Sequence, residues 1–270
     1  MSKRSVSERT RNYWSKMYEL RYFIWHLVKL DLRNKFRRSK LGMLWTFVSP
    51  LCLTLIMSVV FSIVFHYDIA TYAPYILSGI LFWDIMSSAF QSGAFVIISN
   101  QFYIRQCCHP YSLYTLKSTI VYLITFMIAM ISLLCWLIFV NPIGILWGLL
   151  FIVPALIVYF PITWAGTTIA AYTGAKYRDY PLMIPLIMQA LWYVSPVFFQ
   201  EEMFKSSDVL YNFFLYSPIT CLLNLIRSPF LYNRPPVWKD YGISLLFAAL
   251  LCLWAWRIAH KNGKEIIFYL

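Results

Sequence analysis

Long apolar segments recur along the chain, and most of them match the thickness of a lipid bilayer. A helix needs roughly 20 apolar residues to cross about 30 Å of hydrocarbon. By this measure the chain has six candidate spans, at residues 41–65, 73–99, 118–140, 145–175, 182–199 and 241–256. Because little polar sequence separates these runs, they predict an all-α integral membrane protein rather than a large soluble core. We expect six transmembrane helices in a single transmembrane domain over residues 1–270.

The segment before the first span has a helical pattern of another kind, with a period of about 3.6 residues. Its apolar positions share one arc of a helix: Leu20, Phe23, Ile24, Leu27 and Leu30. Basic residues occupy the opposite side, which is typical of a helix lying in the membrane interface. We therefore predict a cytoplasmic tail over residues 1–19 and an amphipathic interface helix over residues 20–37. That helix either anchors the chain only or also shapes the surface on which a partner docks.

Residues 200–239, before the last span, form a long outer stretch that is not plainly soluble. Its apolar segments are too short to span a bilayer, and Pro218 and Pro229 interrupt them. Proline ends or kinks a helix, and irregular backbone at membrane depth must face protein or water. The pattern predicts short re-entrant helices in this outer region.

Composition agrees with a membrane location and adds an orientation. Hydrophobic residues make up 60% of the chain and charged residues 13%, with a net charge of +12. Lys and Arg crowd the first 40 residues and the predicted inner loops, and cations near short loops stay on the cytoplasmic side. Six spans then place both termini in the cytoplasm. The basic start predicts no cleavable signal peptide, and its position beside the first span favours anionic lipid over nucleic acid.

Several kinds of chemistry have no support in the sequence. A nucleotide-binding loop ends in Gly-Lys-Ser/Thr, but the Gly-Lys pair at 263–264 precedes a glutamate. The four histidines are scattered and the six cysteines show no ligand spacing, so we predict no catalytic residue, metal or cofactor on this chain. Asp84, inside the second span, is either structural or functional. Glu201 and Glu202 would point about 100° apart on a helix, which favours a solvated acidic patch.

Three motifs, spread over positions 37 to 230, resemble a known family. The first is Arg37-Arg38-Ser39-Lys40-Leu41-Gly42-Met43-Leu44-Trp45, followed by Ser49-Pro50-Leu51. The second is Tyr177-Arg178-Asp179, leading through Pro185 and Gln189 to Ser195-Pro196-Val197. The third is Ser217-Pro218, leading through Leu222 to Ile226-Arg227-Ser228-Pro229-Phe230. Together they resemble the permease subunits of type-2 ABC transporters that export bacterial polysaccharides, and the region of Arg227 is most similar to the O-antigen group.

The resemblance implies partners that the chain itself does not reveal. It implies a homodimer of this chain in the bacterial inner membrane, above two copies of a cytoplasmic nucleotide-binding subunit. ATP and Mg would bind to that subunit, which accounts for the missing nucleotide loop. The implied cargo is a polysaccharide on an undecaprenyl-type lipid carrier, of the O-antigen, capsule or teichoic-acid class.

The resemblance also implies contacts for the short inner elements at residues 100–114 and 174–181. In the family, such elements fit clefts on the ATPases. The matching residues here are Gln101, Phe102, Tyr103, Arg105, His109, Tyr177, Arg178 and Asp179. The chain departs from a common pattern after Pro110, because Tyr111-Ser112 stands where many members have a basic–acidic pair.

Aromatic and basic residues are the candidate substrate contacts. Sugar rings present apolar C–H faces that stack on aromatic rings, although most membrane aromatics belong to the core or the interface. The resemblance places the first and fifth spans around the path, which selects Trp45, Phe61, Phe65, Trp192, Tyr193, Phe198 and Phe199. Arginine binds phosphate in bidentate fashion. The candidates for the carrier's pyrophosphate are Arg33, Arg37 and Arg38 on the inner side and Arg227 and Arg234 on the outer side.

The sequence leaves two rival functions open beside polysaccharide export. One is export of a small hydrophobic compound by a related type-2 permease. The other is an integral-membrane transferase that acts on lipid-linked sugars, for which Asp84, Glu201 and Glu202 are the carboxylates to test.

Overall fold

The computed structural model describes residues 18–37, 39–66, 68–106, 109–199, 208–262 and 266, and nearly all of them are helical. The elements in chain order are α2 (Arg21–Phe36), α3 (Leu44–Phe65), α4 (Ile69–Phe90), η1 (Ser92–Phe95), α5 (Val96–Ser99), α6 (Gln101–Gln106), α7 (Tyr111–Val140), α8 (Pro142–Lys176), α9 (Tyr180–Val194), α10 (Asp208–Tyr216), α11 (Pro218–Tyr232) and α12 (Trp238–Asn262). The described residues contain no strand. The predicted all-α class is confirmed for this part of the chain.

Five of the described helical stretches are long and apolar enough to cross a membrane. They are α3, the α4–η1–α5 stretch, α7, α8 and α12. The fifth predicted span, 182–199, corresponds to α9, which has only 15 residues and is about 22 Å long. It ends at Val194 because Pro196 disfavours helical backbone at the residue before it, and Ser195 is extended. The predicted count of six spans therefore stays a prediction.

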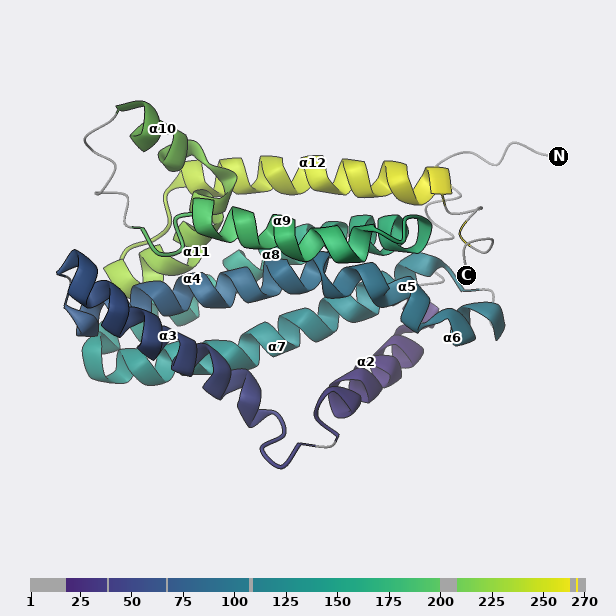
Figure 1. Cartoon of the computed structure of the whole chain (residues 1–270), viewed down its shortest axis with the longest axis horizontal. Helices are drawn as coiled ribbons and strands as arrows, with labels where there is room; N and C mark the ends of the chain where they lie inside the picture. Colours follow the sequence, from purple (N-terminus) through teal and green to yellow (C-terminus); the bar gives the residue numbers. More distant parts are fainter. Residues whose placement is uncertain are drawn as a thin grey trace.

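The long helices run back and forth between the two ends of the molecule (Figure 1). At one end lie the α3–α4 and α7–α8 junctions, together with α10 and α11. The opposite end carries α6, the turn between α8 and α9, and the last residues of α12. At the α7–α8 junction, the Asn141 side chain accepts a hydrogen bond from the Gly144 amide, and Pro142 occupies the first helical turn. This junction is thus a tight hairpin.

The helix α4 lies at the centre of the bundle. It packs against α3, α7, α8 and α11, and most of its side chains are buried. By contrast, α3 and α12 leave most of their apolar surface uncovered. An apolar surface of this kind needs lipid or another protein chain to cover it.

The predicted interface helix exists as α2 and has the expected amphipathic arc. Ile24, Leu27 and Val28 are buried, and they form a cluster with residues of α5, α7 and α8. The helix is tilted relative to the long helices and lies beside the start of α7 (Figure 1). Its apolar side therefore packs on protein, where the sequence pattern alone suggested a lipid surface.

Two short helices, α10 and α11, occupy the region where short re-entrant helices are predicted. Pro218 is the first residue of α11, as expected for a helix start, but Pro229 lies inside the same helix. The prediction that Pro229 interrupts a helix is wrong, because α11 continues to Tyr232. It packs between α4, α8 and α12, and these neighbours hold it in place.

Close packing between α8 and α11 depends on glycine, which gives a first testable prediction. A Cβ atom at Gly148 would overlap the Phe230 ring, whereas a Cβ at Gly242 would meet nothing within 4 Å. We expect Gly148→Ala to destabilise the purified chain by about 1–3 kcal/mol, the usual cost of overpacking a core. Gly242→Ala is the matched control and should leave thermal unfolding in detergent unchanged. Equal unfolding temperatures for the two variants would contradict this packing.

Candidate functional site

Four of the seven predicted path aromatics form one group, although they come from different parts of the chain. The Phe198 ring lies 5.5 Å from the Phe61 ring of α3 and 4.8 Å from the Trp192 ring of α9. The exposed Tyr193 ring lies beside Trp192, with ring centroids 5.5 Å apart and the two planes tilted by 48°. We call Phe61, Trp192, Tyr193 and Phe198 the aromatic group. It joins α3 to α9, the two elements predicted to border a path.

Among the described residues, the other predicted aromatics are Trp45 and Phe199. Trp45 is exposed near the start of α3, sixteen residues before Phe61 and therefore about 24 Å away along the helix. Phe199 is half-buried, and its carbonyl accepts a hydrogen bond from the Tyr75 hydroxyl at 2.7 Å. The Phe65 side chain lies outside the described residues. The first span thus presents aromatics near both of its ends.

A buried hydrogen-bond network fixes the segment that carries Phe198. The guanidinium of Arg227 donates to the carbonyls of Pro196 at 2.8 Å and Val197 at 2.9 Å. It also donates to the Tyr75 hydroxyl at 2.9 Å and lies 3.7 Å from the centre of the Tyr75 ring. The neighbouring Tyr72 hydroxyl donates to the Phe198 carbonyl at 2.7 Å. Residues 195–199, which follow the end of α9, are therefore held by side chains of α4 and α11.

Arg227 differs from the other predicted phosphate ligands, because it is only 2% exposed and its donors face protein acceptors. Arg234 is exposed at the same end and lies over the Tyr232 ring at 5.2 Å. Arg33 and Arg37 are exposed on and just after α2. Arg38 lies outside the described residues. In this structure, Arg227 supports the fold around the aromatic group and presents no outward-facing donor.

The predicted coupling residues gather at the end of the molecule opposite α10 and α11 (Figure 1). On α6, four of them are exposed: Gln101, Phe102, Tyr103 and Arg105. The turn between α8 and α9 exposes the other set: Tyr177, Arg178 and Asp179. His109 is half-buried, and its ring lies 5.3 Å from that of Phe23 in α2. Two separate connections therefore present polar and aromatic side chains on one end surface, as a docking surface requires.

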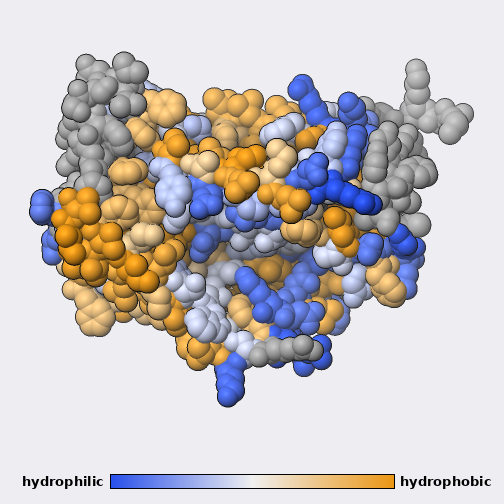
Figure 2. Space-filling model, viewed as in Figure 1, coloured by the Kyte–Doolittle hydropathy of each residue, from blue (hydrophilic) through white to orange (hydrophobic). Residues whose placement is uncertain are grey.

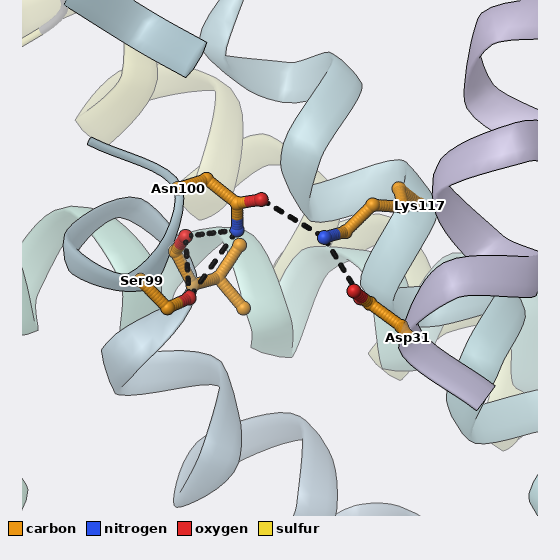
Figure 3. Close-up of polar contacts among 5 residues, drawn as sticks. Asp31, Ser99, Asn100 and Lys117 are labelled. Carbon is orange, nitrogen blue, oxygen red and sulfur yellow. Dashed lines mark hydrogen bonds and ion pairs between the residues drawn. The ribbon is translucent and has the colours of Figure 1, made fainter. Parts of the chain in front are cut away.

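An ion pair between a buried lysine and a partly exposed aspartate links α7 to α2, and the sequence pattern did not reveal it (Figure 3). Lys117 of α7 lies 2.7 Å from the Asp31 carboxylate of α2 and donates to the Asn100 side-chain oxygen at 2.9 Å. Asn100 in turn donates to the Val96 carbonyl and stands directly before α6. The sequence feature that could have indicated the pair is Lys117 itself, a lysine inside an apolar helix, because a buried cation needs a partner. We call Asp31, Asn100 and Lys117 the inner triad.

Hydrophilic side chains gather at the end that carries α2, α6 and the α8–α9 turn, and hydrophobic surface dominates the other side of this view (Figure 2). Lys176 lies in the last turn of α8, at this end. The opposite end, by comparison, exposes Arg234 beside Tyr232. The predicted orientation, in which cations remain on the cytoplasmic side, stays a prediction.

Known proteins show similarity along most of the chain. No protein-family model matches it. The O-antigen export system permease protein RfbA of Myxococcus xanthus is 20% identical over 260 residues, covering 93% of this chain and 95% of that protein. Two proteins of the same name from Klebsiella pneumoniae are each 22% identical over 222 residues, covering 79% of this chain and 83% of theirs. The resemblance predicted from the three motifs is confirmed, and this chain is a distant relative of the O-antigen export permeases.

Proposed function

We propose that this chain is the permease subunit of an ATP-driven exporter that moves lipid-linked polysaccharide of the O-antigen type across the bacterial inner membrane. The observation that carries the proposal is similarity to O-antigen export permeases over 93% of the chain. Five described helical stretches suited to crossing a membrane support it. The chain provides the path, while ATP and Mg bind to a separate nucleotide-binding subunit.

The proposal includes six crossings, with α9 as the fifth. Although α9 is short, residues 195–199 extend it toward the end that carries α10 and α11 (Figure 1). Tyr72, Tyr75 and Arg227 satisfy carbonyls of this extension, which is what irregular backbone at membrane depth requires. Six crossings place both termini on the basic, cytoplasmic side. On this proposal α10 and α11 are the re-entrant outer helices.

The path is proposed to run beside α3 and α9 at the interface of a homodimer. Both helices expose large apolar side chains, among them Ile56 at 62%, Ile63 at 70% and Leu186 at 69%. The aromatic group lies where the two helices meet and offers stacking surfaces for sugar rings. Among the described residues, the buried Trp192 indole nitrogen has no hydrogen-bond partner, so it is free to donate to a sugar hydroxyl.

The inner end is proposed as the ATPase-docking surface, formed by α6 and the α8–α9 turn. The inner triad connects α6 to α2 and α7, so a push on α6 is transmitted directly to the interface helix. Arg33 and Arg37 are exposed on this side and are placed to meet the carrier's pyrophosphate as it enters. Arg234 is the corresponding candidate for the pyrophosphate on the outer side, because the Arg227 side chain is buried inside the protein.

A gene deletion tests the function. Cells that lack this chain should accumulate carrier-linked polymer inside and lose most surface polymer, because synthesis continues while the path is missing. Thin-layer and immunoblot analysis of inner and surface fractions measures both, with plasmid-borne wild-type chain as the control. Normal surface polymer in the deletion strain would overturn the proposal. Sugar transfer by the purified chain alone would support the transferase alternative, in which case Asp84 becomes the described carboxylate to substitute; Glu201 and Glu202 lie outside the described residues.

A further inference from the structure

A cavity of about 330 Å³ with both polar and apolar walls opens between α2, α3, α4 and α7, apart from the aromatic group. Its chemistry-bearing lining residues are Lys35, Trp45, Ser49, Asp84, Ser88 and Tyr122. Figure 2 shows a hollow on this face, with polar side chains inside it. Ligand sites in proteins range from about 300 to 1,000 Å³, so this cavity suits a small ligand and has no room for a polymer or a lipid tail.

Asp84 is the unusual member of this lining. It stands in the middle of a helix suited to crossing a membrane, where a carboxylate is costly and commonly functional. Its neighbours Trp83 and Ile85 are buried in the core, whereas Asp84 is exposed toward the cavity. Among the described residues it makes no hydrogen bond and no close ion pair. No donor in the described part of the chain binds the Asp84 carboxylate, so its oxygens are available to accept hydrogen bonds from a ligand.

The charges around the cavity limit the class of ligand. Burial lowers the pKa of Lys35, and the Asp84 carboxylate opposes that shift. An anionic headgroup would meet the carboxylate, and a cationic ligand would meet the lysine. A neutral molecule with several hydroxyl groups can donate to Asp84 and accept from Lys35 at the same time. The remaining polar groups, among them Ser49 and Ser88, are hydroxyls with the same dual capacity.

The other walls have the chemistry that sugar rings require. Trp45, which lines the cavity, is 50% exposed and offers an indole face for the C–H side of a ring. Ser92 and Ser99 follow Ser88 along the α4–η1–α5 stretch. They line a second polar cavity, which lies beside the inner triad. A track of hydroxyl groups thus leads from the inner end of the molecule to Asp84.

We infer that this cavity is a subsite for one neutral hexopyranose ring, in which Asp84 accepts from ring hydroxyls, Lys35 donates to one and Trp45 stacks on the ring. The inference rests on the proposed function, because the ring belongs to the exported chain near its entry point. The first motif contributes Trp45 and Ser49 to this subsite, but neither the motifs nor the predicted path residues include Asp84 or Lys35.

Ligand-detected NMR on the purified full chain in detergent tests the subsite. The probes are the methyl pyranosides of glucose, galactose and mannose, with inorganic pyrophosphate as the anionic probe. We expect saturation transfer to at least one pyranoside, and at least about tenfold weaker binding after Asp84→Leu and after Trp45→Ala, since each removes a main contact. Asp84→Asn, which keeps an acceptor, should lose less. Asp68→Leu and Trp238→Ala, both exposed near the opposite end, are the matched controls.

Each outcome bears on the inference. No pyranoside signal from the wild type, equal signals from Asp84→Leu and Asp68→Leu, or a preference for pyrophosphate would overturn it. A structural role for the Asp84 and Lys35 charges predicts instead that Asp84→Leu unfolds the chain and that adding Lys35→Met restores its unfolding temperature without affecting pyranoside binding. The deletion experiment is independent, because loss of surface polymer in the deletion strain upholds the exporter even where Asp84→Leu binds sugar normally.

Discussion

Replacing Arg227 by leucine is expected to abolish polymer export and to lower the stability of the chain markedly. The guanidinium donates to the carbonyls of Pro196 and Val197 and to the Tyr75 hydroxyl, and it is 2% exposed. A buried acceptor that loses its donor costs about 1–3 kcal/mol, so the loss of these bonds amounts to at least about 3 kcal/mol. Because residues 195–199 carry Phe198, the aromatic group loses its anchor as well.

Thermal unfolding in detergent and surface polymer together measure this effect. Arg227→Lys keeps the charge but lacks the planar fork, so it should recover part of the stability. Arg234→Leu is the control for stability, since Arg234 is exposed at the same end of the molecule. Surface polymer should fall at least about tenfold in Arg227→Leu. Wild-type unfolding and wild-type export in that variant would show that this network does not hold the segment.

Replacing Asp31 by alanine is expected to detach α2 from the bundle. The change leaves the Lys117 ammonium buried, with the Asn100 side-chain oxygen as its remaining partner within the inner triad. Breaking a buried pair commonly costs 3–5 kcal/mol, and we expect about 3 kcal/mol here because the Asp31 side chain is 39% exposed. Hydrogen exchange should accelerate in α2 (Arg21–Phe36) and at the Asn100–α6 junction, while α12 remains protected.

A second substitution separates the charge from the packing. In Asp31→Ala/Lys117→Met, the buried cation is replaced by an apolar side chain of similar length, so exchange in α2 should return toward the wild-type rate. Asp68→Ala removes an exposed carboxylate near the opposite end and is the control. If the double variant exchanges as fast as Asp31→Ala, packing and not the buried charge determines how α2 is held.

The pattern of apolar residues predicted most of the helices but few of their first and last residues. Hydrocarbon thickness fixes how long a spanning run must be, so five of the predicted spans correspond to long helices. The ends depend on local contacts that composition does not contain. The first long helix begins at Leu44 rather than at residue 41, after Gly42 in a left-handed conformation, and Pro229 lies within α11 instead of breaking it.

The functional residues divide in the same way. Residues that face outward, such as Tyr177 and Arg178, lie where the motifs predict them, because a connection between two long helices must reach the surface. Arg227 was predicted as a phosphate ligand, but its partners come from α4 and from residues 195–199, far away in sequence. A local sequence pattern does not predict which distant carbonyls a side chain will bind.

By itself, the sequence determined a basic, multi-helix membrane chain without a nucleotide loop, because hydrophobic burial and charge placement act on segments one at a time. Only the tertiary structure decided that Lys117 pairs with Asp31, that Phe61 meets Phe198, and that Asp84 opens into a cavity. These are pairings between distant segments, and their energies depend on distance and desolvation, which exist only once the helices have packed.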